Sequence, residues 1–446
     1  MTTLLWFRDD LRVTDHAALT AALHDGPTVA VWIRESVGPR PLGAAVRWWY
    51  HRSLEELRHS LADLGVPLVF AAGDARSVVP ELAARLGATT VRWSRRYAPA
   101  ARAIDAEVKQ TLREAGVSAH SHAGSLLVEP FEVAPAGKEF YQVFTPFYRA
   151  ASERGFSDPL PAPGPLPEDA RATAESPLTL EELGLLAPGP AWWEETVEKH
   201  WQPGETAGLA HVTDTAWVPG YATDRDLPGA PDGTSKLSPY LRSGNLSPAY
   251  VAVAVSAHSG EDADSWIRQL YWREFCWHIY YHHPALATRP LRTQFELFPY
   301  QPDPDVVRAW QRAETGIDFV DAGMAQLWHT GWMHGRVRMS AASLLTKNLL
   351  QPWQDGEQWF WNTLVDADEA TNPFSWQWVA GCGADAAPYF RIFNPELQQK
   401  KFDPTSAYTS HWLKVRGGLP SAPIVDLKES RREALAAYEV VKSGPL

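Results

Sequence analysis

The sequence predicts an α/β domain followed by an all-α domain: a doubly wound, Rossmann-like parallel sheet at the N-terminus and a helical domain after it. Over residues 1–125, short apolar runs of β type alternate with amphipathic stretches of helical period, and such alternation implies right-handed βαβ crossovers and a parallel sheet. From about residue 195 onward the periodicity is helical, without alternating runs of useful length. The predicted divisions are a sheet domain (1–125), a linker (126–195) and a helical domain (196–446).

Apolar runs of β type define four predicted strands, which are Thr3–Phe7, Thr28–Ile33, Pro67–Ala71 and Thr89–Trp93. A fifth, weaker run lies near Ser118–His122. The amphipathic stretches predicted as helices are Ala44–Leu64, Ala75–Leu86 and Ala101–Ala115. Gly65, Gly87 and Gly116 each stand just past one of these helices, where a C-terminal cap favours glycine. The turn after the first strand lacks a Gly-x-Gly-x-x-Gly pattern, so we expect no pyrophosphate to bind at that loop in the manner of dinucleotide-binding sheets.

The linker is rich in proline. From residue 159 to 167, proline alternates with small or apolar residues, a composition that favours extended polyproline over helix. We expect a structural spacer that wraps between the two domains, with a docking motif for a partner protein as the alternative. A short helix is predicted at Tyr141–Arg149, before this stretch.

The helical domain carries most of the unusual side chains. Its predicted helices are Trp192–Trp201, Thr206–Leu209, Pro248–Ala257, Ser265–His282, Asp305–Ala313, Phe319–Thr330, Arg336–Leu350 and Gly356–Leu364. Eleven of the chain's 21 tryptophans fall between Trp266 and Trp378, interleaved with basic residues. A core packs equally well on Leu and Ile, which have no indole N–H to satisfy. Dense indoles among cations indicate stacking on nucleobases or a flavin, and electron hopping, with an aromatic-rich core as the alternative.

Composition excludes several classes of protein. No window of about 18 apolar residues exists, so nothing is expected to span a membrane, and the N-terminus lacks the basic and apolar regions of a signal peptide. Cys276 and Cys382 are too few for a disulfide framework and predict a cytoplasmic location. A net charge of −12 argues against a generic nucleic-acid coat, although residues 324–348 hold three basic and no acidic residues.

A hydroxyl-rich turn, Thr234-Ser235-Lys236-Leu237-Ser238, precedes Pro239 and a helix. Such a turn offers N–H and O–H donors to phosphate oxygens, with a simple N-cap as the alternative. No Ser–His–Asp arrangement is apparent locally, and no cysteine stands beside a candidate base. Hydrolytic chemistry through a nucleophilic side chain is therefore unsupported.

Two further clusters suggest metal ligands but lack the required spacing. His278, His282 and His283 follow Glu274 without the His-Glu-x-x-His pattern of a zinc site. The pair Asp366 and Asp368 lacks the glycine and distal glutamate of a calcium loop. We therefore predict no metal site, and we expect the two aspartates to accept hydrogen bonds from ring N–H groups and ribose hydroxyls.

Six motifs, in order along the chain, resemble the photolyase/cryptochrome family. They are Trp6-Phe7-Arg8-x-Asp10-Leu11-Arg12, Thr234-Ser235-Lys236-Leu237-Ser238, Trp272-Arg273-Glu274-Phe275, Gly331-Trp332-Met333-His334, Trp376-Gln377-Trp378 and the run Asp385–Pro395. The resemblance covers nearly the whole chain and is nearest to bacterial class I cyclobutane pyrimidine dimer photolyases. It implies an N-terminal domain for an antenna chromophore and a helical domain that cradles FAD. It also implies light-driven repair of UV-damaged DNA, in which excited reduced FAD lends one electron to a flipped-out dimer.

The resemblance also implies roles by motif position. The residues implied to bind FAD are Tyr221, Thr234, Ser235, Lys236, Leu237, Ser238, Trp266, Gln269, Arg273, Asp366, Asp368 and Asn372, the last facing flavin N5. The implied electron path runs from Trp376 through Trp353 to Tyr300. The residues implied to contact DNA or the dimer are Gln269, Trp272, Arg273, Arg336, Arg338, Met339, Trp378 and Arg391. The implied protein is a monomer whose partner is damaged DNA.

Three residues depart from the family pattern. Gln269 stands where the dimer photolyases place a glutamate, and glutamine there resembles (6-4) photolyases and animal cryptochromes. An amide keeps the hydrogen bonds but supplies no charge. Gly335 replaces a usual asparagine, and Tyr300 replaces the distal tryptophan. These departures leave two alternative functions open, a cryptochrome-like blue-light photoreceptor and a (6-4) photolyase. Against the (6-4) alternative, Met339 is the residue that resembles the dimer photolyases at its position.

The antenna has a candidate site on the first long helix. Arg47, Trp48 and Trp49, together with Arg242 across the domain interface, are similar to binders of 8-hydroxy-5-deazaflavin more than to binders of folate. An ordinary amphipathic helix is the alternative interpretation.

Overall fold

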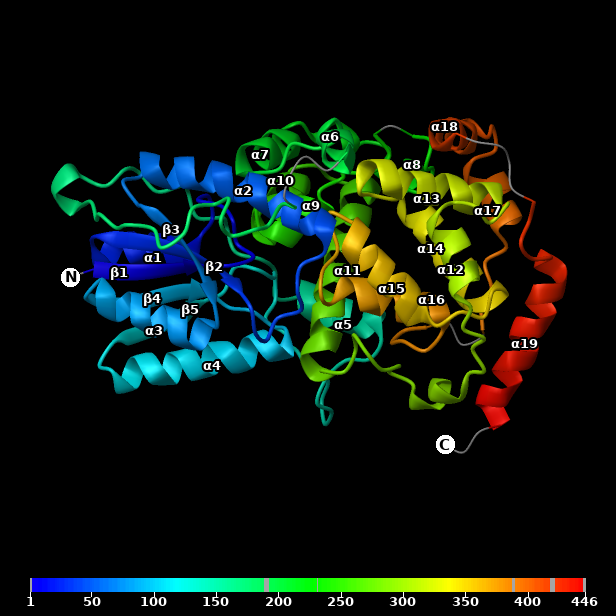
Figure 1. Cartoon of the computed structure of the whole chain (residues 1–446), viewed down its shortest axis with the longest axis horizontal. Coiled ribbons are helices and arrows are strands. Elements are labelled where there is room, and N and C mark those ends of the chain that lie inside the picture. The colour runs from blue at the N-terminus through cyan, green and yellow to red at the C-terminus, as the bar shows by residue number, and fades with distance from the viewer. Residues whose placement is uncertain (1, 188–191, 231, 387–389, 418–421, 444–446) are drawn as a thin grey trace.

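The computed structural model describes residues 2–187, 192–230, 232–386, 390–417 and 422–443. A parallel five-stranded sheet and its helices form one end of the molecule, and the helical domain forms the other (Figure 1). The strand order is β3-β2-β1-β4-β5, with every neighbouring pair parallel. The order reverses between β1 and β4, which is the point beyond the carboxyl ends of the strands where doubly wound sheets bind ligands.

The strands are β1 (Thr2–Phe7), β2 (Thr28–Glu35), β3 (Leu68–Gly73), β4 (Ala88–Ser94) and β5 (Ser118–His122). The helices that accompany them are α1 (Ala17–Asp25), α2 (Ala44–Asp63), α3 (Ala75–Arg85) and α4 (Pro99–Glu114), followed by α5 (Phe144–Ser152) and the 3₁₀ turn η1 (Glu168–Ala170).

The first helices of the second domain are α6 (Trp192–Glu198), α7 (Glu205–Thr213), the 3₁₀ turn η2 (Thr215–Trp217), α8 (Tyr221–Asp224), α9 (Ser238–Ser243), α10 (Pro248–Ser256), α11 (Glu261–His282) and the 3₁₀ turn η3 (Thr293–Leu297). The remaining elements are α12 (Pro304–Gln311), α13 (Asp318–Thr330), α14 (Gly335–Ser343), the π turn η4 (Leu344–Asn348), α15 (Trp353–Thr363), α16 (Thr371–Ala380), α17 (Pro395–Phe402), α18 (Ala407–Arg416) and α19 (Leu427–Ser443).

The doubly wound sheet is confirmed, with all five predicted strands in place. Gly65, Gly87 and Gly116 have φ angles of +79°, +58° and +79°, the left-handed conformation that ends a helix and that glycine adopts without strain. The sequence did not predict α1. Its cap is an unusual one, since the His16 ring accepts the Leu19 N–H at 3.0 Å in place of a Ser, Thr, Asp or Asn side chain.

The proline-rich linker lies along the sheet domain. The Leu166 N–H donates to the Leu64 carbonyl at 2.9 Å, and the Leu178 N–H donates to the Phe70 carbonyl at 3.2 Å. Its backbone is thus tied to the end of α2 and to β3, and its role as a spacer between the domains stays a prediction.

The helical domain differs from the sequence prediction at several elements. The helices α8, α17, α18 and α19 were not predicted. The predicted helix Arg336–Leu350 divides into α14 and the π turn η4, and π turns often occur at functional sites. The helix α16 was not predicted, because most of its side chains are buried and its sequence has no polar face.

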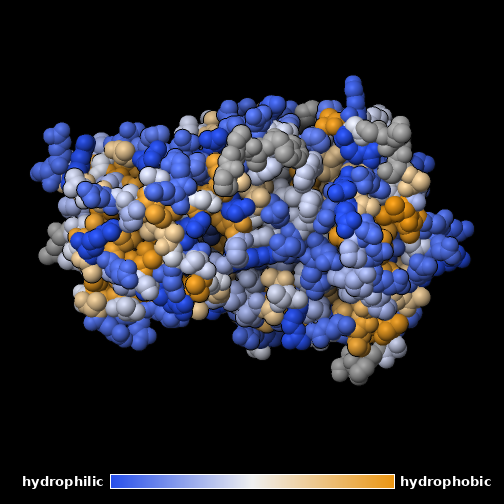
Figure 2. All heavy atoms as spheres, viewed as in Figure 1, coloured by the Kyte–Doolittle hydropathy of each residue, from blue (hydrophilic) through white to orange (hydrophobic). Residues whose placement is uncertain are grey.

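The tryptophans of the helical domain divide between the core and partly open positions. Four of them are at most 2% exposed: Trp310, Trp353, Trp361 and Trp376. For these four tryptophans the alternative interpretation, an aromatic-rich core, is correct. Figure 2 shows that hydrophilic residues cover much of the visible face, with hydrophobic atoms in separate patches. No helix in the described residues is long and apolar enough to cross a membrane.

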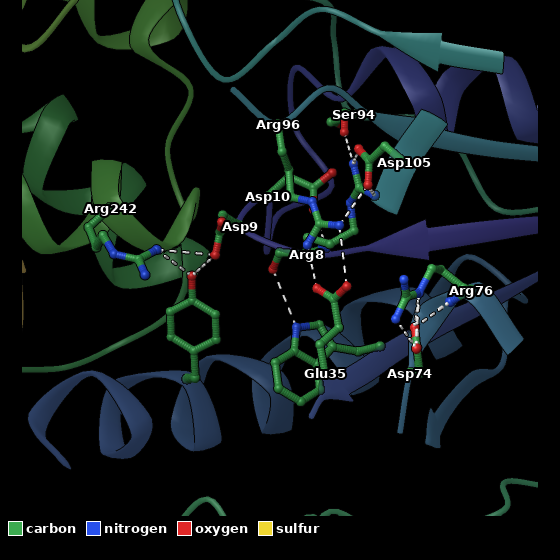
Figure 3. Close-up of polar contacts among 12 residues, drawn as sticks. Arg8, Asp9, Asp10, Glu35, Asp74, Arg76, Ser94, Arg96, Asp105 and Arg242 are labelled. Atoms are coloured by element: carbon green, nitrogen blue, oxygen red, sulfur yellow. Dashed lines mark hydrogen bonds and ion pairs between the residues drawn. The ribbon is translucent and has the colours of Figure 1, made fainter. Parts of the chain in front are cut away.

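Arg242 of α9 holds the helical domain against the sheet domain. Its guanidinium donates to Asp9 at 3.1 Å and to the Tyr50 hydroxyl at 2.8 Å (Figure 3). Its Nε donates to the Ala367 carbonyl at 2.7 Å. One side chain therefore joins the loop after β1, the helix α2 and the segment before α16.

Glu274 of α11 ties the helical domain to the linker. Its carboxylate accepts the N–H groups of Leu127 and Val128 at 2.8 and 3.3 Å and the Arg273 guanidinium at 3.1 Å. Burial raises the pKa of Glu274 to about 7, because desolvation of the charged form outweighs these donors.

We predict that Glu274 lowers the stability of the fold as the pH rises toward neutrality. Because its pKa in the folded state lies above its unfolded value of about 4.5, its contribution is fully present below that pH and is lost as the pH rises through about 7. In Glu274→Gln this loss is absent. The unfolding free energy of Glu274→Gln should therefore rise relative to that of the wild type, by up to about 1.4 kcal/mol per pH unit between about pH 5 and 7.

Denaturant unfolding across this pH range measures the shift. The matched control is Glu132→Gln, at an exposed ion pair with Arg154, which should show no such trend. A difference between Glu274→Gln and the wild type that is the same at every pH contradicts the prediction.

Candidate functional site

A cavity of about 410 Å³ in the helical domain collects most of the residues expected to bind FAD. The predicted residues in its lining are Tyr221, Ser235, Leu237, Ser238, Trp266, Gln269, Trp272, Arg273, Arg338, Met339, Asp366, Asp368, Asn372 and Trp376. They come from α8, α9, α11, α14, α16 and the segments before α9 and α16. A volume of this size is typical of a cofactor pocket.

Hydroxyl groups line one side of the cavity. Ser235 is 9% exposed, and Ser238, the first residue of α9, donates to Asp366 at 2.7 Å. Burial raises the pKa of Tyr221 to about 12, and its hydroxyl is a donor at neutral pH, as that of any tyrosine is. Lys236 adopts a φ of +51°, is exposed and is not among the residues that line the cavity.

Arg338 and Asp366 form a bidentate pair in the cavity wall. The guanidinium donates to the two carboxylate oxygens at 3.2 and 2.9 Å, and its Nε donates to the Met333 carbonyl at 2.7 Å. Such a pair holds both side chains in one geometry. The sequence predicted a DNA phosphate contact for Arg338, whereas the structure places it beside the expected cofactor.

Asp368 caps the N-terminus of α16. One of its carboxylate oxygens accepts the N–H groups of Ala370 and Thr371 at 2.9 and 2.5 Å, and a side-chain cap of this kind stabilises a helix by typically about 1 kcal/mol. Because α16 also carries Asn372 and Trp376, the cap positions these two lining residues as well.

Asn372 presents an acceptor to the cavity. It is 7% exposed, and its amide nitrogen donates to the carbonyl oxygen and to Oε1 of Glu357 at 3.0 and 2.7 Å. Both amide N–H groups are therefore engaged, and the side-chain oxygen is the group left for a ligand. An acceptor in this position suits a ligand that carries an N–H.

Trp272 offers one face of its indole to the cavity. Its other face stacks on Phe144 of α5, with ring centroids 3.7 Å apart and ring planes 8° from parallel. Gln269 and Met339 are partly buried members of the same lining. A flat, apolar surface beside a polar amide suits a nucleobase.

Trp376 connects the cavity to the aromatic core. It is 2% exposed, and its ring centroid lies 5.0 Å from Phe360 and 6.0 Å from Trp310. Gly356 makes this packing possible, because a Cβ at that position would lie 2.1 Å from the Trp376 ring.

The other two residues of the expected electron path lie in the same region. Trp353 belongs to the hydrophobic cluster that includes Trp376 and Trp310, and Tyr300 packs against that cluster. Burial raises the pKa of Tyr300. Trp310 is a ring neighbour of Trp376 that no motif indicated.

The remaining residues expected to meet DNA do not line the cavity within the described part of the chain. Arg336 pairs with Asp226 at 2.5 Å, and Arg391 is exposed. The Trp378 indole is partly buried. Residues 387–389 of the last motif lie outside the described residues.

The histidines of α11 have structural partners. The ring nitrogens of His278 contact the Pro130 carbonyl at 3.1 Å and the Tyr141 N–H at 3.0 Å. His282 stacks on Phe140, with ring centroids 4.9 Å apart. The part of the chain that the structure describes contains no group of three His, Cys, Asp or Glu residues that could hold a metal ion.

A second cavity, of about 60 Å³, lies between the domains beyond the carboxyl ends of β1 and β4. It shares Leu241, Arg242, Arg273 and Asp368 with the larger cavity, so a single layer of side chains separates the two. Its sheet-domain wall carries buried charges, among them Arg8 and Arg96 (Figure 3). Sixty cubic ångströms is well below the roughly 300 Å³ at which ligand pockets begin.

Of the residues expected around an antenna, Arg242 alone lines this second cavity among the described residues. Trp48 and Trp49 are fully buried in the core, and the Trp49 Nε1 donates to Asn245 at 2.9 Å. Arg47 is exposed. These three positions fit the alternative interpretation, an ordinary amphipathic helix.

The larger cavity also contains residues that no motif indicated. They are Leu241, Leu270, Cys276, Ala342, Phe360, Leu364, Ala367, Thr371, Ser375 and Val379. Most are small or apolar, and in the sequence such residues are indistinguishable from the core of a helix.

Two family models match the chain. The model described as DNA photolyase matches residues 3–165, and the model described as the FAD binding domain of DNA photolyase matches residues 266–433. Together they cover more than half of the chain.

Similar proteins match over nearly their whole length. The deoxyribodipyrimidine photo-lyase of Agrobacterium fabrum is 42% identical, over 98% of this chain and 98% of its own. The crystal structure of a bacterial class III photolyase from Agrobacterium tumefaciens has a TM-score of 0.92 at 40% identity and covers 99% of this chain and 98% of that one. A cryptochrome from Synechocystis sp. has a TM-score of 0.86 at 26% identity, over 98% and 99%. The class III description belongs to the Agrobacterium protein, and the affinity of this chain to class I stays a prediction.

Proposed function

The chain belongs to the DNA photolyase family, and from this membership we propose how its side chains carry out the activity. That activity is the light-driven repair of cyclobutane pyrimidine dimers in UV-damaged DNA, with FAD as cofactor, by a deoxyribodipyrimidine photo-lyase. The observation that carries the conclusion is the cavity of the helical domain, which brings the predicted cofactor and lesion residues together.

The groups in this cavity suit FAD. Ser235 offers a hydroxyl to phosphate oxygens, and Ser238 would offer one in exchange for its hydrogen bond to Asp366. Asp366 and Asp368 offer acceptors to ribose hydroxyls and to the ring imide. The Asn372 oxygen offers an acceptor to an N–H at flavin N5. When bound and reduced, FAD supplies the light-driven electron that splits the cyclobutane ring, and the electron returns to it afterwards.

The lesion site is proposed to lie beside the open face of Trp272. The dimer, flipped out of the duplex, would stack on this indole and contact Met339, with the Gln269 amide hydrogen-bonded to a base edge. Unpairing is least costly at a damaged pair, because its pairing is already impaired. The lesion itself therefore contributes to selectivity.

Arg336 and Arg391 are the proposed phosphate contacts outside the cavity. Phosphate contacts position a duplex without reading its sequence, which suits an enzyme that acts on a lesion in any context. Arg336 would exchange or share its ion pair with Asp226 on binding. Because one chain carries every residue in this scheme, a monomer suffices, and the expected location remains cytoplasmic.

The proposed electron path for reducing the bound flavin runs from Trp376 through Trp353 to Tyr300. The three residues come from α16, α15 and the segment after η3, and they pack in or against one hydrophobic cluster. A tyrosine at the end of the path must lose a proton when it is oxidised. Since burial raises the pKa of Tyr300, that proton would leave only on oxidation.

An antenna of the deazaflavin type, favoured over folate, is proposed for the second cavity. Arg242 and Asp368 form part of the wall that this cavity shares with the FAD site. Excitation energy would therefore be transferred from the antenna to the flavin over a short distance. The cavity must widen to take a ring system. Absorption spectra of the protein with each chromophore added would distinguish the two types.

One experiment tests the function against the alternatives. The purified protein, with its flavin reduced, is illuminated with oligonucleotides that carry either one thymine cyclobutane dimer or one (6-4) product. Recovery of intact thymines from the cyclobutane dimer alone is expected. Recovery from the (6-4) product alone would establish the (6-4) enzyme suggested by Gln269. No recovery from either, with flavin bound and reducible, would favour a photoreceptor of the cryptochrome type.

Gln269→Glu is predicted to raise the yield of dimer repair. A hydrogen bond to a charged group is roughly twice as strong as a neutral one, and a gain of about 1 kcal/mol corresponds to about fivefold. The initial rate of thymine recovery per absorbed photon measures the change. Gln301→Glu, at an exposed position, is the matched control. A yield in Gln269→Glu no higher than in this control would show that the amide is already optimal.

A further inference from the structure

Arg40 reaches from the sheet domain into the helical domain. It stands between β2 and α2, and its guanidinium donates to both carboxylate oxygens of Glu357, at 2.6 and 2.9 Å. The Arg40 side chain is 23% exposed and the Glu357 side chain 4%. A bidentate pair with one buried partner has a fixed geometry, and removing the arginine would leave a buried carboxylate without its counter-ion.

The segment around Arg40 is packed closely against α15. The Arg40 guanidinium lies over the Trp361 ring, 4.1 Å from its centroid, and the Trp361 Nε1 donates to the Pro41 carbonyl at 2.9 Å. A Cβ at Gly43 would lie 1.9 Å from the Trp361 carbonyl oxygen, so only glycine permits this approach. The position of Arg40 is therefore set by the docking of the two domains.

Glu357 transmits this position to the FAD cavity. It accepts both amide N–H groups of Asn372, one through its carbonyl oxygen and one through Oε1, the same atom that accepts from Arg40. If the Asn372 amide were reversed, its oxygen would face two acceptors of Glu357. The pair of Arg40 and Glu357 thus keeps the Asn372 oxygen directed away from Glu357 and available to the cavity.

We propose that Arg40 is a positioning residue for the flavin, acting through Glu357 to hold the Asn372 oxygen toward N5. This inference rests on the proposed FAD site. An acceptor at this position stabilises a flavin that carries a proton on N5, as reduced flavin does, and opposes oxidised flavin, whose N5 is itself an acceptor. The docked sheet domain thereby raises the reduction potential of the bound cofactor.

Arg40→Gln tests the proposal in the full-length protein loaded with FAD, in the dark and without DNA. The variant loses the two guanidinium N–H groups that bind the Glu357 carboxylate, so the Glu357 side chain is free to turn and the Asn372 amide is free to reverse. We expect the equilibrium constant for reducing the bound FAD to fall about tenfold, which is about 30 mV for a two-electron couple. A redox titration against a reference dye, followed by the flavin absorption, measures the shift.

Three further variants separate positioning from a general loosening of the domains. Arg52→Gln removes another ion pair across the interface, with Glu198 at 3.3 Å, and should leave the potential unchanged. Arg40→Lys keeps the positive charge but loses the bidentate contact with Glu357, so its reduction potential should shift less than that of Arg40→Gln. In a Glu357→Gln background the buried charge is gone, so adding Arg40→Gln should shift the potential little.

The outcomes are distinct. A potential in Arg40→Gln that moves no further than in Arg52→Gln overturns the proposal, as does an equal shift in the Glu357→Gln background. A wild-type protein that takes up no FAD overturns the proposed cofactor site, and this inference with it. A shift confined to the Arg40 variants and abolished by Glu357→Gln supports it.

Discussion

Trp376→Phe is expected to abolish the reduction of bound FAD by light. Trp266 and Trp272 also line the FAD cavity, but Trp376 is the one that continues into the hydrophobic cluster with Trp353 and Trp310. Phenylalanine keeps the packing yet is far harder to oxidise than an indole, so the first step out of the cavity is lost. The flavin spectrum under blue light with an external thiol measures the rate.

The repair reaction itself should survive this change. When the flavin of Trp376→Phe is reduced chemically with dithionite, dimer repair should match the wild type. The path through Trp376 serves to reduce the flavin, and it is not used for electron transfer from the flavin to the lesion. Loss of repair after chemical reduction would instead show that Trp376 is needed to hold the cofactor.

Two neighbouring variants decide the direction of the path. Trp353→Phe should abolish photoreduction as Trp376→Phe does, whereas Trp310→Phe, the same exchange in a second ring neighbour of Trp376, should leave it. The reverse pattern would route the electron through Trp310 and contradict the proposed path to Tyr300.

Arg242→Met is expected to destabilise the protein by about 3 kcal/mol and to weaken FAD binding. Methionine fills much of the space but leaves the Ala367 carbonyl and the Tyr50 hydroxyl without their donor, and a buried group left unsatisfied costs about 1–3 kcal/mol. Asp9 limits the loss, because its side chain is 46% exposed and water can solvate it. FAD affinity falls because Arg242 holds the segment that carries Asp368.

Denaturant unfolding and titration with FAD measure the two effects. The matched control is Arg308→Met, whose ion pair with Asp305 is exposed and should contribute at most about 1 kcal/mol. If Arg242→Met is no less stable than this control, Arg242 does not hold the domains together.

The fold was largely predictable because its signals are local. Strands β1 to β4 are short, largely apolar runs separated by amphipathic helices, and Gly65 and Gly87 end two of those helices in the left-handed conformation. Each signal acts over a few residues, which is the range that sequence periodicity reports. The elements that were missed include α1 and α16, whose sequences lack a polar face or a standard cap; α8, α17, α18 and α19 were also not predicted.

The cofactor site was predictable where a short motif carries it. Ser235, Ser238, Asp366, Asp368 and Asn372 were assigned from local patterns that resemble the family, and all of them line one cavity. The antenna residues were less predictable. Trp48 and Trp49 pack into the core, because a motif of aromatic and basic residues on a helix does not determine which side of that helix faces a partner.

The sequence alone determined the sheet-and-helix architecture and the family, and it indicated many of the residues that line the larger cavity, since these depend on local patterns of polarity and on motif order. Only the tertiary structure decided that Arg338 pairs with Asp366 and that Arg40 reaches Glu357, 317 positions away in the chain. Contacts of this kind have no local signature. They exist because two separately folded surfaces meet, and their geometry is determined by how the domains pack.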